Sequence, residues 1–213
     1  TEDKLKSIQA KIEKLGGEAE IYPTDLTKKD ELDELIKHLE SKEIDIFINN
    51  AGKSIRRSIF DSLDRSHDFS RPLSLTYQAP VNIILKLIPS LIKNKGQIIN
   101  VSSASVLLLP VPKWAAYQAS KKAFEQWFLS VGIELKDRNV CFSTIYLPLV
   151  KTRMIAPTKQ YDNMPAMTPE LVSIIISNLI LKRKNLHKPW WIIFGQIFTC
   201  LLYTSPSPRD KRQ

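Results

Sequence analysis

Apolar residues recur along this chain at helical spacing in some stretches and in short unbroken runs in others. The helical stretches and the short runs alternate, and each run has the length and β-branched content of a strand. Strand, helix and strand in this order predict a parallel sheet with right-handed crossovers. Helices are expected over 1–15, from Thr27 onward, and over 66–94, 115–135 and 168–181, and strands over 19–22, 44–48, 97–101 and 140–146.

Helix ends and prolines add local detail. Thr27 followed by Asp30 predicts a capping box at the start of the second helix. Thr168 before Pro169 predicts a capped start with proline at the first helical position. The long stretch over 66–94 contains two early prolines, and a break or kink is expected near each, at Pro72 and Pro80.

The composition is that of one globular domain. The chain has 213 residues, of which 43% are hydrophobic and 25% charged. No uninterrupted apolar run is long enough to cross a bilayer, and no signal peptide opens the sequence. The only cysteines, Cys141 and Cys200, give no disulfide framework, which favours a reducing, cytoplasmic setting.

The net charge of +9 has several readings. It can be a solvated basic face, or it can favour an anionic, phosphate-bearing ligand or a membrane surface. Nucleic acid is not an expected partner, because the basic residues are scattered among acidic ones and carry no binding motif. The apolar, aromatic stretch 189–198 is expected to pack or to contact a subunit, with insertion into a membrane interface as the alternative.

The last stretch looks foreign to the rest of the chain. Residues 200–210 read like the in-frame translation of a sequencing adapter, and residues 211–213 like whatever followed it. We therefore expect two parts, a natural domain over 1–199 and a non-native tail over 200–213.

Candidate chemistry lies where strands end. Asn49, Ser103 and Pro148 each follow a strand's carboxyl end, which is where open α/β sheets bind ligands. Tyr117 and Lys121 are four residues apart on a helix and share one face, so the ammonium can favour the ionised phenol. This pair alone is weak, because a core tyrosine beside a solvated lysine has the same spacing.

Four motifs in order resemble the short-chain dehydrogenase/reductase superfamily. They are Asn-Asn-Ala-Gly over 49–52, Asn-Val-Ser-Ser over 100–103, Tyr-x-x-x-Lys over 117–121, and Pro148 with Thr152. Within the superfamily, the segments over 49–58, 64–69 and 147–158 are similar to the short-chain fatty acyl-CoA reductases. The resemblance runs over nearly all of 1–199 and implies a Rossmann-like doubly wound sheet.

The resemblance also implies roles for individual residues. Ser103 would hold the substrate carbonyl, Tyr117 would donate the proton, and Lys121 would favour the tyrosinate and bind the nicotinamide ribose. NADPH is the implied cofactor, with NADH not excluded. Its remaining contacts would come from Asp25 and Leu26 near the adenine, Asn49, Ala51 and Gly52 along the channel to the ribose, and Pro148, Val150 and Thr152 near the nicotinamide. For Asp25, capping a turn is an equally good role.

The implied substrate is a long-chain acyl-CoA, reduced to the aldehyde. A generic ketone or 3-oxoacyl reductase and a catalytically silent binding protein remain alternatives. By analogy with the superfamily, the protein is expected to form a homo-oligomer through the helix that carries Tyr117 and the long helix before it. Peripheral membrane contact is kept as an alternative to a purely cytoplasmic location.

The sequence departs from the family pattern in three ways. No glycine-rich dinucleotide turn precedes the first helix, so we expect a fragment that lacks the first strand, first helix and second strand and binds dinucleotide poorly. Thr76 stands where the family has an asparagine of the proton relay. The interval from Ser103 to Tyr117 is one residue longer than usual, which leaves Ser105 as a weaker candidate for the catalytic serine.

The remaining chemistry-bearing residues suggest no further site. His67 beside Asp68 is expected at the surface or in a supporting role, and His38 and His187 have no partner at metal-ligand spacing. Cys141 is expected to be a structural thiol. The sequence suggests no metal site, and no nucleophile with a histidine and an acid partner that would indicate a hydrolase.

Overall fold

The computed structural model describes residues 2–155, 158, 161 and 163–204. The predicted helices and strands are present with shifts of one to two residues at their ends, apart from the differences given below. The elements are α1 Glu2–Lys14, α2 Lys29–Glu40, β1 Ile46–Asn49, η1 Phe60–Ser62, α3 His67–Leu73, η2 Ser74–Gln78, α4 Ala79–Lys93, β2 Gln97–Ser103, η3 Ala104–Val106, α5 Ala115–Glu134, η4 Lys136–Arg138, β3 Cys141–Leu147, α6 Pro169–Lys182, β4 Leu186–His187 and α7 Ile192–Thr204.

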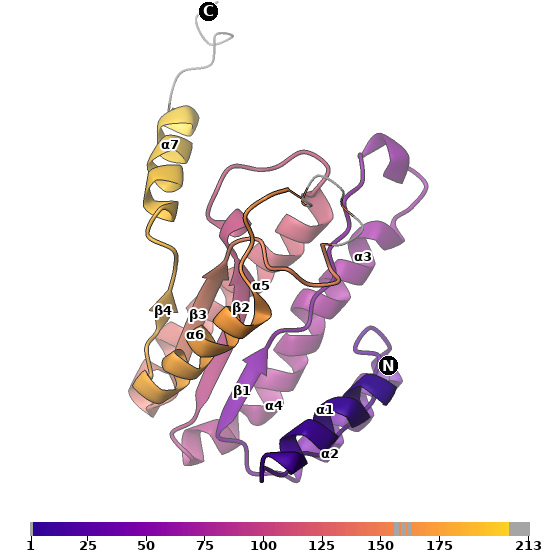
Figure 1. Ribbon diagram of the computed structural model, residues 1–213, viewed down its shortest axis with the longest axis vertical. Coiled ribbons are helices and arrows are strands. Elements are labelled where there is room, and N and C mark those ends of the chain that lie inside the picture. The colour runs from indigo at the N-terminus through magenta and orange to yellow at the C-terminus, as the bar shows by residue number, and fades with distance from the viewer. Residues whose placement is uncertain (1, 156–157, 159–160, 162, 205–213) are drawn as a thin grey trace, which may run out of the picture.

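The four strands form one parallel sheet in the order β1-β2-β3-β4. All the arrows in Figure 1 therefore point the same way, and the carboxyl ends of the strands lie at one edge. Along β2 the side chains alternate between two cores: Ile98 packs with α2, α4 and α5, and Ile99 packs with α6. Helices cover both faces of the sheet, which confirms the predicted Rossmann-like doubly wound fold.

The long helix continues through both prolines instead of breaking. Pro72 lies inside α3, Pro80 lies in the first turn of α4, and a π-helical segment, η2, joins the two helices. Proline lacks an N–H, so it fits a helix start without loss of a hydrogen bond, and the wider π turn accommodates the irregular backbone between the two helices. The irregularity expected near Pro72 and Pro80 is therefore present as a change of helix type: α3 ends one residue after Pro72, and α4 begins one residue before Pro80.

This continuity gives a helix of 27 residues, His67–Lys93, with a mean hydropathy of 1.2 over its most apolar window. By length and composition it is a candidate membrane span, which the sequence pattern alone did not suggest. In the structure its α4 part buries Ala79, Ile84, Leu87 and Leu91 against the sheet and α5, as a core helix does.

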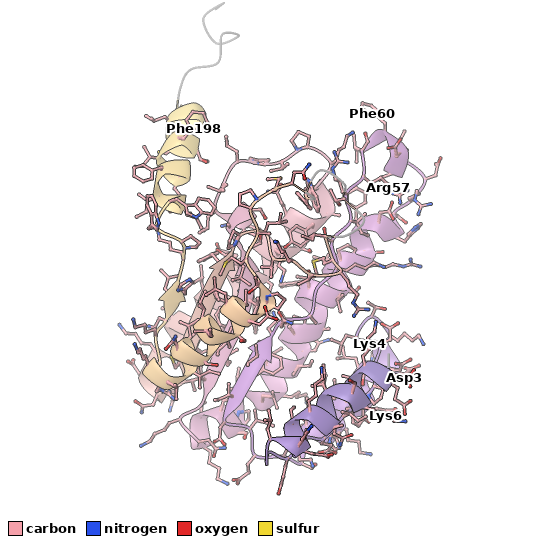
Figure 2. All side chains as sticks on the ribbon, viewed as in Figure 1. Asp3, Lys4, Lys6, Arg57, Phe60 and Phe198 are labelled. Atoms are coloured by element: carbon pink, nitrogen blue, oxygen red, sulfur yellow. The ribbon has the colours of Figure 1, made fainter. Side chains whose placement is uncertain are left out.

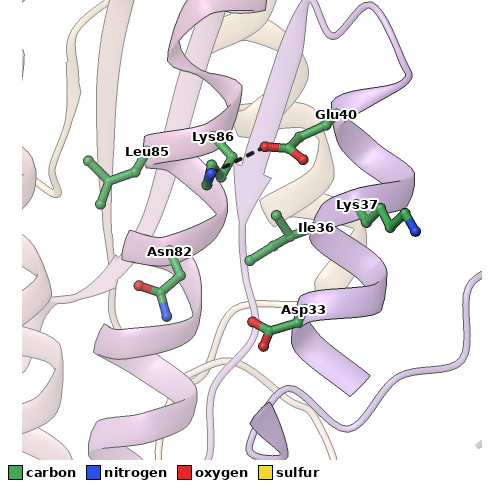
Figure 3. A pocket seen from close by; sticks show the side chains of 7 residues that line it. All are labelled: Asp33, Ile36, Lys37, Glu40, Asn82, Leu85 and Lys86. Carbon is green, nitrogen blue, oxygen red and sulfur yellow. Dashed lines mark ion pairs between the residues drawn. The ribbon is translucent and has the colours of Figure 1, made fainter. Parts of the chain in front are cut away.

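Helix α2 packs beside α4, and a groove of about 310 Å³ lies between them. In Figure 3, Ile36 points from α2 toward α4, and a dashed line joins Lys86 to Glu40. The two charged atoms of this ion pair are 3.4 Å apart and both side chains are exposed, so the pair adds little stability. The packing of the α2 stripe, which includes the buried Leu32 and Ile36, holds the two helices together.

Two predictions near the N-terminal end are wrong. The segment 19–22 is not a strand, because a strand needs a hydrogen-bonded neighbour and no described strand pairs with it. The capping box of Thr27 and Asp30 does not form either. Thr27 instead donates its hydroxyl and its backbone N–H to Asp25, and Lys28 stands at the N-cap, where its side chain makes no capping hydrogen bond.

The C-terminal elements agree with the sequence at α6 and add two others. Thr168 caps α6 by accepting a hydrogen bond from the Leu171 N–H at 3.3 Å, as predicted. The short strand β4 was not anticipated, because two residues carry no detectable periodicity. Helix α7 begins inside the aromatic stretch, buries Ile192, and continues past residue 199 into the expected tail, of which 205–213 lie outside the described residues.

Candidate functional site

The carboxyl ends of β1, β2 and β3 bring the three predicted strand-end residues to one edge of the sheet. Asn49 and Ser103 are the last residues of β1 and β2, and Pro148 directly follows β3. Behind Asn49, the chain turns through Gly52 against α5. A methyl group at Gly52 would lie 3.7 Å from Cε and Nζ of Lys121, so this turn passes directly over the lysine.

The Ser103 hydroxyl lies beside the Tyr117 phenol and acts to lower its pKa, as expected for a serine and a tyrosine acting on one substrate atom. Ser105 lies beside them, with its hydroxyl oxygen 2.9 Å from that of Ser103. Ser105 therefore contacts Ser103 and not the tyrosine, which supports Ser103 as the residue that pairs with Tyr117. The tyrosine side chain is half-buried, so it is not sealed in the interior.

Lys121 is buried, although a lysine usually keeps its charge in water. Its ammonium donates a hydrogen bond of 2.9 Å to the Val101 carbonyl, and no described acidic side chain pairs with it. Burial lowers the pKa of Lys121 to about 8. A cation held at this cost, with two N–H groups left to donate, is typical of a ligand-binding group.

The expectation that Lys121 makes the phenol acidic is wrong for this structure. Burial raises the pKa of Tyr117, and the neighbouring Ser103 hydroxyl lowers it by less. The lysine reaches the Val101 carbonyl and does not enter this balance. Tyr117 is therefore a protonated phenol at neutral pH, which is the form that donates a proton.

Thr76 lies in the π turn and is completely buried, with no hydrogen-bond partner for its hydroxyl among the described residues. Two buried amides on the sheet are also incompletely satisfied: Nδ2 of Asn49, and both polar atoms of Asn100. Asn49 and Asn100 are register partners on neighbouring strands. A buried polar group without a partner costs about 1–3 kcal/mol, so these side chains are candidates for binding a ligand or water.

The other predicted cofactor residues take different positions. Asp25 is exposed and accepts two hydrogen bonds from Thr27, which lower its pKa and are the turn-capping role weighed from sequence. Leu26 packs on the core. Val150 forms a parallel bridge with Met167, and Thr152 is exposed beyond it. Ala51 is half-buried in the turn after β1, next to Gly52.

A hollow of about 300 Å³ opens beside the first turn of α5, immediately before Tyr117. Arg57 and Phe60, two of its lining residues, lie at the same end of the molecule as the carboxyl ends of the strands (Figures 1 and 2). Apolar side chains dominate its lining, with cations at Arg57 and Lys113. The apolar lining residues are Ile55, Ile59, Phe60, Phe69, Pro112, Ala115 and Ala116.

One of the residues that line this hollow, Asp68, is a buried acid. Asp68 forms ion pairs with Arg57 at 3.0 Å and Arg65 at 3.1 Å, and His67 lies 3.4 Å away, in the supporting role expected from sequence. Burial works against the charge of Asp68, yet the two arginines hold its pKa below the usual value.

Several residues of the site were not found from the sequence. Trp114 contacts Tyr117 edge to face and stacks on Tyr161, with ring centroids 5.9 and 6.0 Å apart, so two aromatic rings line the approach to the tyrosine. Glu125 is buried one turn beyond Lys121 and binds hydroxyls on two strands. The available signal was its spacing, since Tyr117, Lys121 and Glu125 recur every four residues and share a helix face.

No group of three or more histidine, cysteine or acidic residues suited to a metal ion occurs among the described residues. Cys141, expected to be a structural thiol, is half-buried and contacts the Arg183 carbonyl at 3.4 Å.

The chain is similar to known proteins over most of its length. The model of the short chain dehydrogenase family matches residues 1–163. A fatty acyl-CoA reductase of Acinetobacter baylyi is 41% identical over 186 residues, which cover 86% of this chain and 63% of the relative. A fatty acyl-CoA reductase of Mycobacterium tuberculosis is 41% identical over 169 residues, or 78% of this chain and 58% of the relative. The chain thus spans about three fifths of the length of these relatives.

Solved structures share the fold. A short-chain dehydrogenase from Sphingobium yanoikuyae in complex with NADPH superposes with a TM-score of 0.79 at 17% identity, covering 96% of this chain and 85% of the other. A short-chain dehydrogenase/reductase from Caenorhabditis elegans with cofactor gives a TM-score of 0.71 at 25% identity, covering 84% and 76%.

Proposed function

The chain belongs to the short-chain dehydrogenase family, and on this premise we propose that the protein is an NADPH-dependent reductase of long-chain acyl-CoA thioesters. The observation that carries the proposal is the grouping of Ser103, Tyr117 and Lys121 at the carboxyl edge of the sheet, where the Ser103 hydroxyl lies beside the Tyr117 phenol and Lys121 binds the Val101 carbonyl of the same strand. The acyl-CoA substrate is supported by the two reductases with 41% identity to this chain.

The residues present suit a dinucleotide. Lys121 has two donors beyond its bond to the Val101 carbonyl, and these match the hydroxyls of a ribose. Asn49, with an unpartnered buried amide, and the close turn at Gly52 would line the same channel. Pro148, Val150 and Thr152 would meet the nicotinamide end. When bound, the cofactor supplies the hydride.

The chain's own residues would bind and protonate the substrate oxygen. Ser103 holds the thioester carbonyl by a hydrogen bond, and Tyr117 gives up its phenolic proton to that oxygen as negative charge develops. The product of this step is a hemithioacetal, whose C–S bond breaks to release the aldehyde and free CoA thiol. The balance is one hydride and one proton added to the acyl-CoA, with NADP⁺, aldehyde and CoA as products.

The hollow before Tyr117 suits the acyl chain. Its apolar lining can bury methylene groups at about 0.8 kcal/mol each, and Arg57 and Lys113 can attract the phosphates of CoA. Lys113 lies four residues before Tyr117, and Arg57 lies on the loop that packs against it, where the Arg57 N–H binds the Lys113 carbonyl at 2.9 Å.

The test is turnover by the full-length protein. NADPH oxidation is followed at 340 nm with palmitoyl-CoA, while released CoA is titrated with a thiol reagent and the aldehyde is identified by mass spectrometry. Equal amounts of NADP⁺, CoA and aldehyde are expected. Turnover of a simple ketone or a 3-oxoacyl thioester, without aldehyde from palmitoyl-CoA, would instead assign the protein as a generic reductase of its family.

A catalytically silent binding protein is the second candidate, favoured by Thr76 in the position of the relay asparagine. It predicts NADPH binding with no turnover of any of these three substrates. Calorimetry with NADPH beside the turnover assay separates the two candidates.

Two partners are proposed beyond the substrate. A homo-oligomer through α4 and α5 is supported by exposed Leu85, Leu129 and Ile133 on these helices. Peripheral membrane contact is supported by Phe194 and Phe198, which are exposed on α7 (Phe198 is labelled in Figure 2). Light scattering tests the first proposal, and sedimentation with anionic vesicles tests the second.

A further inference from the structure

A carboxylate is buried behind the reacting residues and has no part in the proposed chemistry. Glu125 lies on α5 and is only 1% exposed, which makes it one of the most buried side chains of the fold. One of its oxygens accepts a hydrogen bond of 2.8 Å from the Tyr146 hydroxyl, and the other accepts one of 3.1 Å from the Ser102 hydroxyl. Its closest described cation is the half-exposed Lys122, at 3.8 Å.

The two hydroxyls come from neighbouring strands at the same level of the sheet. Ser102 on β2 and Tyr146 on β3 are register partners, so Glu125 spans the strand pair from above. Both hydroxyls are buried with it. A carboxylate group that accepts from both sides fixes the direction of each hydroxyl, and an apolar side chain in its place would leave two buried donors unpaired.

This bridge lies next to the reacting groups on both of its elements. On α5, Glu125 is one turn beyond Lys121 and two turns beyond Tyr117, on the same face. On β2, Ser102 directly precedes Ser103, whose hydroxyl lies beside Tyr117. Lys121 binds the carbonyl of Val101, so two successive turns of α5 are tied to consecutive residues of β2.

We infer that Glu125 is a positioning residue: by holding Ser102 and Tyr146, it fixes the end of β2 against α5 and so sets Ser103 within hydrogen-bond reach of Tyr117. The inference rests on the proposed function, because the proposed function is what makes Ser103 and Tyr117 act in the same reaction. A displacement of about 1 Å at such a pair is enough to lower a rate by about 100-fold, so the effect is measurable.

The test compares Glu125→Gln with Glu134→Gln in the full-length protein. Glutamine keeps the size of Glu125 but has an N–H₂ group in place of one accepting oxygen. One of the two hydroxyls therefore faces a donor and loses its acceptor. Glu134 lies on the same helix, exposed, and its variant is the matched control. We expect kcat per NADPH-binding site to fall at least tenfold in Glu125→Gln, KM for NADPH to stay within twofold, and the isotope effect with deuterated NADPH to rise.

The single variants at the two hydroxyls refine the expectation. Ser102→Ala is expected to lower kcat more than Tyr146→Phe, because Ser102 is bonded directly to Ser103 along the chain. Combining Ser102→Ala with Glu125→Gln is expected to add little beyond the larger single effect, since both break one contact.

A purely structural role predicts a different result and would overturn the inference. In that case Glu125→Gln lowers the melting temperature and the number of NADPH-binding sites, but leaves kcat per site and the isotope effect unchanged. If the wild-type protein turns over no substrate, the proposed function fails, and hydrogen exchange in the segment 100–107 then decides about Glu125. Faster exchange in Glu125→Gln than in Glu134→Gln supports the positioning role, and equal exchange refutes it.

Discussion

The ammonium of Lys121 lies 2.9 Å from the carbonyl oxygen of Val101, inside the core, with its pKa lowered by burial to about 8. The contact holds the cation between α5 and β2, away from bulk water. Its position costs stability when the group is charged, and that cost can be measured because it depends on pH.

Replacing Lys121 with methionine is expected to abolish a pH-dependent part of the stability. The folded protein releases the Lys121 proton near pH 8, whereas the unfolded chain keeps it until about 10.5. The unfolded state therefore binds more protons in this window, and the free energy of unfolding rises with pH, by roughly 3 kcal/mol for the whole shift. Urea unfolding of both proteins from pH 7.5 to 10.5 checks this. A constant difference between them would show that the lysine titrates normally.

Tyr117→Phe is expected to lower kcat roughly 100-fold or more, because the proton donor is lost. The phenylalanine ring keeps the edge-to-face contact with Trp114, so NADPH affinity should change little. Single-turnover kinetics and NADPH fluorescence measure the two quantities separately. Tyr22→Phe, at an exposed ring stacked on His38, is the control and should leave both unchanged. Equal activity of the two variants would exclude Tyr117 as the donor.

Thr76→Val tests the residue that replaces the relay asparagine. The buried hydroxyl of Thr76 has no described partner, so a methyl group of the same shape should raise the free energy of unfolding by roughly 1 kcal/mol. Chemical denaturation gives the value. A loss of stability would mean that the hydroxyl binds water, and an unchanged kcat would remove Thr76 from the catalytic set.

Ala115→Leu is expected to shorten the preferred acyl chain. Ala115 lines the apolar hollow, and the larger side chain would displace about two methylene groups, worth about 1.6 kcal/mol or roughly tenfold in kcat/KM for palmitoyl-CoA. Butyryl-CoA should be unaffected. Ala119→Leu, exposed on the same helix and outside the hollow, is the control. If both chain lengths respond alike to Ala115→Leu, the hollow does not hold the acyl chain.

Much of the fold follows from the spacing of apolar residues. The apolar runs of β2 and β3 are long enough to predict strands, and the apolar spacing along α5 is long enough to predict a helix. The failures have identifiable causes. The segment 19–22 has strand-like composition, but a strand forms only where a neighbouring strand hydrogen-bonds with its backbone. Thr27 and Asp30 match the capping pattern, yet Asp25 competes successfully for the Thr27 hydroxyl.

The grouping of residues in the candidate site was predictable where they follow strand ends or form motifs, as Ser103, Tyr117 and Lys121 do. Its electrostatics were not, because spacing says nothing about burial. Lys121 therefore reaches a backbone carbonyl, and the pKa of Tyr117 rises where the helix spacing suggested that it should fall. Glu125 was missed for a related reason, since a single acid on a helix usually faces water.

The π turn at Ser74–Gln78 has a consequence for how the chain can vary in length. A π hydrogen bond encloses one residue more than an α hydrogen bond, so the turn holds one residue that a regular helix would not need. Deleting a single residue there would let the turn close as an α-helix while α3 and α4 keep their orientations. Deleting two would rotate the core-facing side of α4 away from the sheet.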